Sequence, residues 1–354
     1  MKRLKVGIIG AGGISYSHIE AFKKIPEIDV VAIADPNETK LSFVSEKFSI
    51  LKRFANWENI LDEQLDIISI CSPNAFHAQQ AIAALKSGKH VLCEKPLAIN
   101  IEEAQAVIET AQQTNNKFMV AFCNRFAPYC QFIKKMVETN QMGEIYFAKA
   151  SCLRRRGVPG PGTWFTTKKL AGGGPLIDIG VHILDLVIYL MGCPEPQLVV
   201  GVTYNKFKNQ VVDGGWPPIW SRIGDKPTGT FDVEDLAAGF IKFKNNSTLF
   251  LEASWAGNSE TGLKIALWGT KYGAQYWTEA QPPFKIYGDL NGLSTDTTAT
   301  FPVVDVYQAE IEHFVNCVRN NTQPITTPKE ILTVVKIIEN IYKSAETGRV
   351  VEMV

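Results

Sequence analysis

An aspartate and a histidine four residues apart, Asp178 and His182, follow a run of three glycines in the middle of the chain. Side chains at this spacing project from the same face of a helix, so we expect a carboxylate beside an imidazole. Histidine titrates near neutral pH and can accept a hydroxyl proton while hydride leaves the same carbon. Two other interpretations stay open. In the first, the pair lies on a surface helix and has no function. In the second, the pair binds a metal, but a metal would need further ligands that the nearby spacing does not supply, so we expect no metal.

A glycine-rich turn follows the first apolar run of the chain. Gly10 would permit a tight turn, and Gly12 would let the backbone approach a pyrophosphate. Beyond Gly13, the helix expected from about Ile14 would present free N–H groups and a positive dipole to that anion. The third position of the G-x-G-x-x-G pattern holds Ser15, which is small enough for close packing. The pattern predicts a dinucleotide site, with a turn that binds nothing as the alternative.

Asp35 ends the second apolar run, about 20 residues past the glycine turn. A carboxylate at that position can accept hydrogen bonds from the hydroxyl groups of a ribose. Its negative charge would repel a 2′-phosphate, and no arginine follows in the next few residues. We therefore expect NAD rather than NADP, although Lys40 weakens the preference.

Polar residues also follow the third and fourth apolar runs. Ser72, Asn74 and His77 belong to the motif CSPNAFH, which could contact a cofactor or could simply turn the chain into a helix capped by Asn74. Glu94 and Lys95 follow the next run and precede a proline, which would hold the lysine stiffly. Because ligands of open α/β sheets bind at the carboxyl ends of the strands, we expect these side chains to lie together.

The elements that would position these groups alternate along residues 4–121 as βαβ units do, which predicts a parallel sheet. Short apolar runs predict strands at 4–9, 30–34, 66–71, 90–93 and 118–121. Helical periodicity predicts helices at 15–24, 38–47, 76–86 and 101–114, the last with Asn100 as its N-cap. After about residue 124, alternating runs at 236–243 and 248–255 predict an antiparallel hairpin, and residues 306–319 and 329–347 two closing helices. We expect domains at 1–123 and 124–354.

Composition narrows the class of protein. The 354 residues carry 36 basic and 36 acidic side chains, so a nucleic-acid partner is not expected. No apolar stretch of about 18 residues stands out, and the most apolar one is interrupted by Asp185, so no membrane span is expected. The seven cysteines are odd in number and scattered, which favours free thiols and a cytoplasmic location.

Taken together, GIIGAGGIS, Asp35, CSPNAFH, CEKP and GGGPLIDIGVHILD resemble, in their order and spacing, the Gfo/Idh/MocA family of oxidoreductases. The resemblance extends over essentially the whole chain. It implies an α/β fold: a Rossmann dinucleotide-binding domain followed by an α/β domain whose open, mainly antiparallel sheet often forms an oligomer interface. A homo-dimer or homo-tetramer is expected on that basis, with a sugar or cyclitol as substrate.

The resemblance also assigns roles to residues. The lysine of the E-K-P motif falls on Lys95, and the D-x-x-x-H pair falls on Asp178 and His182. By this likeness His182 accepts the hydroxyl proton, Asp178 orients and tunes it, and Lys95 stabilises the developing alkoxide. The bond before Pro96 tends to be cis in the family.

Further candidates for substrate binding lie near the same site. Arg125 belongs to a segment that resembles one bordering the active site, and Arg154 and Trp164 fall where a pocket rim would be. For the arginines at 154–156, a solvated or subunit-facing patch is the alternative.

The resulting hypothesis is an NAD-dependent dehydrogenase that moves hydride to or from a secondary hydroxyl carbon of a sugar, cyclitol or sugar derivative. Two alternatives remain: a glycoside hydrolase that uses bound NAD transiently, and a non-catalytic dinucleotide-binding sensor. Retention of Lys95, Asp178 and His182 together argues against the sensor, because a binding module needs no proton acceptor.

Overall fold

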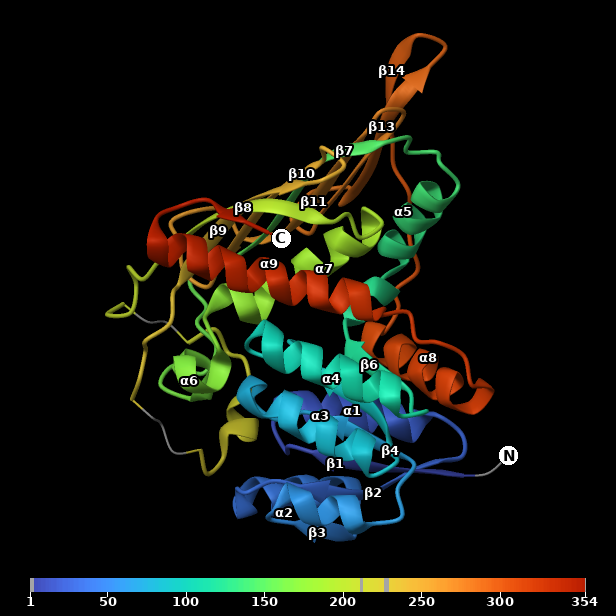
Figure 1. Cartoon of the computed structure of the whole chain (residues 1–354), viewed down its shortest axis with the longest axis vertical. Coiled ribbons are helices and arrows are strands. Elements are labelled where there is room, and N and C mark those ends of the chain that lie inside the picture. Colours follow the sequence, from blue (N-terminus) through green and yellow to red (C-terminus); the bar gives the residue numbers. More distant parts are fainter. Residues whose placement is uncertain (1–2, 211–212, 226–228, 354) are drawn as a thin grey trace.

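Two β-sheets organise the computed structural model, which describes residues 3–210, 213–225 and 229–353 (Figure 1). The first sheet has six strands in the order β3-β2-β1-β4-β5-β6, and every pairing is parallel. Its strands are β1 (Leu4–Ile9), β2 (Ile28–Ala34), β3 (Lys52–Phe54), β4 (Ile67–Ile70), β5 (His90–Glu94) and β6 (Phe118–Ala121). This is the doubly wound order, in which the strand sequence reverses between β1 and β4 and leaves a crevice at the carboxyl ends.

The five strands predicted from apolar runs are all present in this sheet, and β3 is the one that the sequence analysis misses. Two of its three residues are exposed, so no apolar run marks it. The four predicted helices are also confirmed, and Asn100 caps the last one by accepting a hydrogen bond from the Glu103 N–H at 2.8 Å. These helices are α1 (Gly13–Lys24), α2 (Glu38–Phe48), α3 (His77–Lys86) and α4 (Ile101–Gln113).

Both faces of the parallel sheet are covered. Apolar side chains of α1 and α2 share one core with one face of the sheet, and those of α3 and α4 share a second core with the other. Burial on both faces explains why the strands are continuously apolar. The predicted α/β class is confirmed here.

The second sheet has nine strands in the order β14-β13-β12-β11-β7-β10-β9-β8-β15. Only the β7–β10 pairing is parallel among those that the structure describes, so the expected mainly antiparallel sheet is confirmed. The predicted hairpin is β9 and β10. The strands are β7 (Ile145–Leu153), β8 (Pro196–Tyr204), β9 (Leu236–Phe243), β10 (Thr248–Ser254), β11 (Gly262–Gly269), β12 (Gly273–Trp277), β13 (Phe284–Leu290), β14 (Leu293–Thr297) and β15 (Val351–Glu352).

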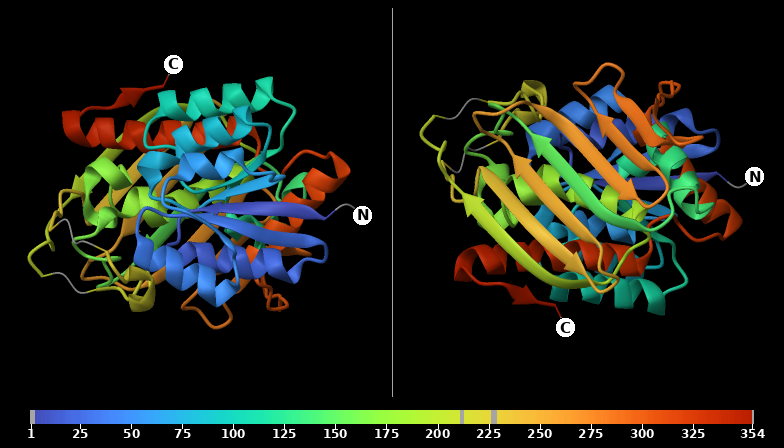
Figure 2. Two further views of the ribbon diagram at one scale, coloured as in Figure 1. Left: turned by 90° about the horizontal axis from the view of Figure 1, so that it is seen from below. Right: turned by 90° about the horizontal axis from the view of Figure 1, so that it is seen from above.

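In the described part of the chain, helices cover the inner face of the second sheet, between it and the parallel sheet (Figure 1). Seen from the opposite side, the strands carry no helix in front of them (Figure 2, right). The helices after β6 are α5 (Pro128–Glu138), α6 (Lys168–Ala171), the π-helical turn η5 (Leu176–Gly180), α7 (Val181–Leu190), α8 (Val306–Asn320) and α9 (Pro328–Thr347). Short 3₁₀ turns are η1 (Trp57–Asp62), η2 (Asn74–Phe76), η3 (Cys123–Phe126), η4 (Trp164–Thr166) and η6 (Ile219–Arg222).

The two predicted closing helices, α8 and α9, take different places. Helix α9 packs along β8 of the second sheet, whereas α8 crosses back and packs against α1. Ile311, Phe314 and Val315 of α8 are fully buried in the core that α1 shares with the parallel sheet. The end of the chain therefore contributes to the fold of its beginning, and the predicted boundary between residues 123 and 124 stays a prediction.

One helical stretch, Lys168–Leu190, is long and apolar enough by length and composition to cross a membrane, which corrects the expectation that no such stretch exists. The sequence analysis considered only the shorter apolar run interrupted by Asp185. In the structure, 89% of the stretch's apolar window is buried inside the protein. Burial of this kind is what the core helix of a soluble protein shows.

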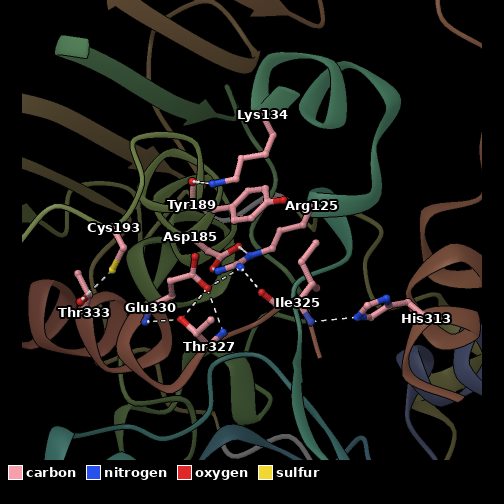
Figure 3. Close-up of polar contacts among 10 residues, drawn as sticks. All are labelled: Arg125, Lys134, Asp185, Tyr189, Cys193, His313, Ile325, Thr327, Glu330 and Thr333. Carbon is pink, nitrogen blue, oxygen red and sulfur yellow. Dashed lines mark hydrogen bonds and ion pairs between the residues drawn. The ribbon is translucent and has the colours of Figure 1, made fainter. Parts of the chain in front are cut away.

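A buried ion cluster joins the parallel sheet to the helices of the second sheet (Figure 3). Arg125 lies on η3, directly after β6, and its side chain is fully buried. Its Nη2 and Nε donate to the two carboxylate oxygens of Asp185 on α7 at 2.6 and 2.9 Å, and its Nη1 donates to Glu330 on α9 at 2.9 Å. Glu330 also closes the capping box of α9 with Thr327.

This position corrects the expectation that Arg125 contacts substrate. The guanidinium points into the protein because two acidic side chains, on α7 and on α9, meet behind η3, and it also stacks 4.5 Å from the ring of Tyr189. Arg125 is not among the residues that line the cavity described below. It positions α7, the helix that carries His182.

Replacing Arg125 by methionine should lower the free energy of unfolding by about 3–5 kcal/mol, because two carboxylates would stay buried without their cation. Chemical denaturation of both proteins measures the difference. The matched control is Arg3→Met, which removes an arginine from a largely exposed pair with Asp29 and should cost no more than about 1 kcal/mol. Equal losses in the two variants would contradict the structural role assigned to Arg125.

Candidate functional site

A cavity of about 620 Å³ opens at the carboxyl ends of the parallel strands. It is closed from the other side by segments of the second half of the chain, which follows β6. Of the predicted site residues, all except Arg125 line it. They are Gly10, Gly12, Gly13, Ile14, Asp35, Ser72, Asn74, His77, Glu94, Lys95, Arg154, Trp164, Asp178 and His182. Groups that are far apart in the sequence therefore meet in one place.

The glycine turn has the shape that the pattern requires. Gly10 has φ +101°, and a Cβ there would lie 2.6 Å from the Cys71 carbonyl at the end of β4, so a side chain is excluded. Gly12 precedes α1, and no atom lies within 4 Å of where its Cβ would be. The backbone is thus exposed to the cavity at the helix N-terminus, where an anion is stabilised. Ser15 at the third position is buried and donates to the Gly12 carbonyl at 2.7 Å, so it closes the turn.

Asp35 links the glycine turn to β2. Its Oδ2 accepts the Ala11 N–H at 2.7 Å, and its Oδ1 accepts the Asn37 N–H at 2.8 Å. Burial raises the pKa of Asp35, while these two backbone donors act in the opposite direction. Each carboxylate oxygen retains a lone pair, so the side chain can hold the turn and still accept a hydroxyl group from the cavity.

The motif after β4 mainly fixes loops. Ser72 donates its hydroxyl to Gln80 at 2.6 Å, and Asn74 donates to the Ala171 carbonyl of α6 at 2.8 Å instead of capping a helix. The two ring nitrogens of His77 each lie 2.7 Å from a backbone carbonyl, that of Ser72 and that of Pro96. Both ring nitrogens of His77 thus lie against backbone carbonyls, while the residue lines the cavity, and its contact with a cofactor stays a prediction. Its place is between the loops that follow β4 and β5.

Lys95 and Asp178 meet across the cavity from the two halves of the protein. The Lys95 ammonium donates to the backbone carbonyl of Asp178 at 2.9 Å and to its Oδ1 at 3.3 Å. Lys95–Pro96 is a cis peptide bond, as the resemblance implies. The other oxygen of Asp178 accepts the indole N–H of Trp255 at 3.0 Å. Asp178 is thus held from both sides.

His182 is the remaining member of the set. Its Nδ1 is buried and has no hydrogen-bond partner within the described part of the chain. By the resemblance Asp178 orients His182, but no hydrogen bond between the two is among the contacts of the described residues, because Asp178 instead bonds Lys95 and Trp255. Burial, followed by the nearby charge of Lys95, lowers the pKa of His182 to about 3. The ring is therefore neutral at physiological pH and able to accept a proton.

Glu94 belongs to a buried pair that the sequence analysis does not identify. Its Oε1 lies 3.0 Å from Nε2 of His18 on α1, and its Oε2 accepts the Lys95 N–H at 3.1 Å. The other ring nitrogen of His18 lies 2.8 Å from the Ser69 hydroxyl. Burial alone would raise the pKa of Glu94, but the hydrogen bond and charge of His18 bring it below its ordinary value. Glu94 thus holds the backbone of Lys95 by accepting its N–H.

Two of the three consecutive glycines before η5 allow the loop to approach Glu234, just before β9, and helix α9 closely. A Cβ on Gly173 would lie 2.0 Å from the Tyr342 hydroxyl, and one on Gly174 would lie 2.1 Å from the Glu234 carbonyl. The buried Glu234 carboxylate accepts the Gly174 N–H at 2.9 Å and the Tyr342 hydroxyl at 2.8 Å. This contact sets where η5 begins and hence where Asp178 lies.

Several residues at or behind the cavity come from places without a specific sequence signal. Trp255, which holds Asp178 from behind, is fully buried and does not line the cavity, and nothing in its local sequence separates it from a core tryptophan. The cavity itself is lined by Cys123, Tyr307, Trp216, Ser221 and Asp225, besides the predicted residues. They come from η3, α8 and a loop of the second half, which only the folded chain brings to the glycine turn.

The parts of the chain that match known proteins include the strands of both sheets. A model of the oxidoreductase family NAD-binding Rossmann fold matches residues 4–122, and a model of that family's C-terminal alpha/beta domain matches residues 134–353. The D-glucoside 3-dehydrogenase of Escherichia coli is 33% identical over 358 residues, which are 99% of this chain and 97% of that protein. The D-xylose 1-dehydrogenase (NADP(+)) 2 of Haloferax volcanii is 26% identical and spans 98% of this chain and 99% of its own. A structure of levoglucosan dehydrogenase in complex with NADH superposes with a TM-score of 0.85 at 24% identity, covering 99% and 98% of the two chains.

The low pKa of His182 predicts how stability varies with pH. An unfolded histidine takes up a proton below about pH 6.5, whereas His182 in the folded protein resists it until about pH 3. Its contribution is therefore fully present above about pH 6.5 and is lost as the pH falls. Between about pH 7 and pH 4.5, wild type should lose about 2 kcal/mol more unfolding free energy than His182→Asn. Urea denaturation at a series of pH values measures this, and parallel curves for the two proteins would contradict it.

Proposed function

The chain belongs to the Gfo/Idh/MocA family of oxidoreductases, and from this premise we propose an NAD-dependent dehydrogenase acting on a secondary hydroxyl of a sugar, cyclitol or sugar derivative. One observation carries the proposal. Lys95, which follows a strand of the parallel sheet, and Asp178 and His182, from the helical segment beneath the second sheet, line the same cavity as the glycine turn. An ammonium group, a carboxylate and a neutral imidazole then line the cavity that we propose as the dinucleotide site.

In the proposed mechanism, bound NAD supplies the hydride acceptor. His182 takes the proton of the substrate hydroxyl, because its ring is neutral and the residue lines the cavity. The Lys95 ammonium stabilises the negative charge that develops on the same oxygen. Asp178 holds Lys95 at its Nζ, and Trp255 in turn holds Asp178. Asp178 is thereby a positioning group for the lysine rather than for the histidine.

A sugar-sized substrate fits the other cavity walls. Trp164 lines the cavity with its ring stacked 3.8 Å from that of Phe165, and such a ring can pack against the apolar face of a sugar. Arg154 lines the same wall and donates to the Gly157 carbonyl at 3.1 Å. The D-glucoside 3-dehydrogenase, similar over nearly the full chain, makes hexoses and their glycosides the first compounds to test.

The preference for NAD rests on Asp35. Its carboxylate faces the cavity at the end of β2, where a ribose hydroxyl would be accepted and a 2′-phosphate repelled. The seven cysteines are all free, which suits a reducing compartment, so a cytoplasmic location is part of the proposal.

The purified protein should bind NADH more tightly than NADPH, as followed by nicotinamide fluorescence. It should also reduce NAD with a member of a panel of glucose, glucosides, levoglucosan and inositols. His182→Ala should lower turnover by a factor of about 10² to 10⁴ and leave the Kd for NADH nearly unchanged. Cleavage of a glucoside without net NADH would instead indicate a hydrolase. NADH binding without turnover of any compound would indicate a sensor.

We also propose that the protein self-associates through the outer face of the second sheet (Figure 2, right). Aromatic rings form a continuous cluster there, with Phe147 centred 4.7 Å from Trp268 and 5.7 Å from Phe250. Trp268 and Phe250 are each 44% exposed. Val200, Val202 and Tyr204 of β8 extend the same apolar surface. Exposed apolar surface of this extent is typical of an interface, and a second copy of the chain is the proposed partner.

Light scattering after gel filtration should give a mass of two or more chains for the wild type. Trp268→Glu should convert it to a monomer, because a charge would be buried at the centre of the interface. The control is Leu51→Glu, which changes an isolated, 91% exposed leucine in the parallel-sheet half and should leave the mass unchanged. A monomeric wild type, or an unchanged mass for Trp268→Glu, would contradict the proposal.

A further inference from the structure

A segment of the second half, residues 213–225, lies against the glycine turn and is called the crossing segment here. A Cβ on Gly13 would lie 3.0 Å from Pro217 and 3.3 Å from the Ser221 hydroxyl of this segment. Gly224 has φ +72°, and its Cβ would lie 2.8 Å from the Asn37 side chain. Glycines on both sides of the contact therefore let the crossing segment approach the ends of β1 and β2.

An ion pair fastens the crossing segment beside the proposed ribose position. Asp225 contacts the ammonium of Lys40, which lies in the first turn of α2. The two side chains are 26% and 12% exposed, and both residues line the cavity. Asn37 adds a hydrogen bond of 3.4 Å to the Ile223 carbonyl. Asp35 is close enough that Asp225 raises its pKa and Lys40 lowers it.

We propose that Asp225 determines cofactor specificity by occupying Lys40, so that the ammonium of Lys40 is not free to bind a 2′-phosphate. The proposal rests on the proposed NAD-dependent function and extends it to a residue of the other half of the chain. A 2′-phosphate needs a charge-assisted partner, and Lys40 is the cation beside Asp35 that lines the cavity. With Lys40 neutralised, the phosphate would instead meet the two carboxylates of Asp35 and Asp225.

A purely structural role for the ion pair predicts a different result. If Asp225 only held the crossing segment in place, its loss would weaken the binding of both cofactors to the same extent. If it occupies Lys40, its loss should strengthen NADPH binding relative to NADH. The ratio of the two dissociation constants therefore separates the two roles, and it does not depend on identifying the substrate.

The experiment measures the Kd of NADH and of NADPH by nicotinamide fluorescence for wild type and Asp225→Asn. The substitution keeps the size of the side chain and removes its charge. We expect the preference to shift toward NADPH by about tenfold or more, the range of one hydrogen bond to a charged group. The double variant Lys40→Met/Asp225→Asn should lose the shift, because the freed cation is gone.

Asp213→Asn is the matched control. It removes the same charge from the same crossing segment, where Asp213 pairs with Arg222 away from Lys40. Its ratio should equal that of the wild type. An unchanged ratio in Asp225→Asn, an equal shift in Asp213→Asn, or a shift that survives in the double variant would each overturn the proposal. A wild type that prefers NADPH would instead contradict the proposed NAD preference, whatever Asp225→Asn does.

Discussion

A buried guanidinium must be paired with carboxylates, and Arg125 is paired with two of them, Asp185 on α7 and Glu330 on α9. The constraint is strong because each of the three charges would be costly to bury alone. It ties the end of β6 to α7 and α9 at once, so the parallel sheet and the helices under the second sheet cannot move apart freely. Asp185 lies one turn beyond His182 on α7. The ion cluster therefore sets the position of the imidazole relative to the strand ends that carry Lys95.

The site is assembled on top of this junction. The backbone and side chain of Lys95 are held by Glu94 and Asp178, and Asp178 is held by Trp255, so the ammonium group has a defined position before any ligand binds. The glycines at 173 and 174 allow η5 to lie against Glu234 and Tyr342. Preorganisation of this kind favours electrostatic stabilisation, because the dipoles and charges need no rearrangement during the reaction.

The sequence pattern was sufficient to predict a feature wherever that feature depends on residues close together in the chain. Gly10 has a positive φ and touches the end of β4, and a glycine at the end of a short apolar run predicts such a turn. The strands of the parallel sheet were predictable because burial on both faces demands continuous apolar runs. The exposed β3 had no such pattern. Arg125 illustrates the opposite case, because Cys123 two residues before it lines the cavity while the carboxylate partners of Arg125 lie 60 and 205 residues away.

The sequence by itself determined the order of the βαβ units, the glycine turn, Asp35 at the end of its strand, and the identity of the Lys, Asp and His side chains. These depend on periodicity and on residues near one another in the chain. Only the tertiary structure decided which groups touch: that Asp178 bonds Lys95 and Trp255 rather than His182, that the ring of His77 lies between two backbone carbonyls, and that Asp225 meets Lys40. Side-chain partnerships are decided by the packing of elements distant in sequence, because hydrogen bonds and ion pairs act over a few ångströms and a short sequence pattern does not encode which distant groups come that close.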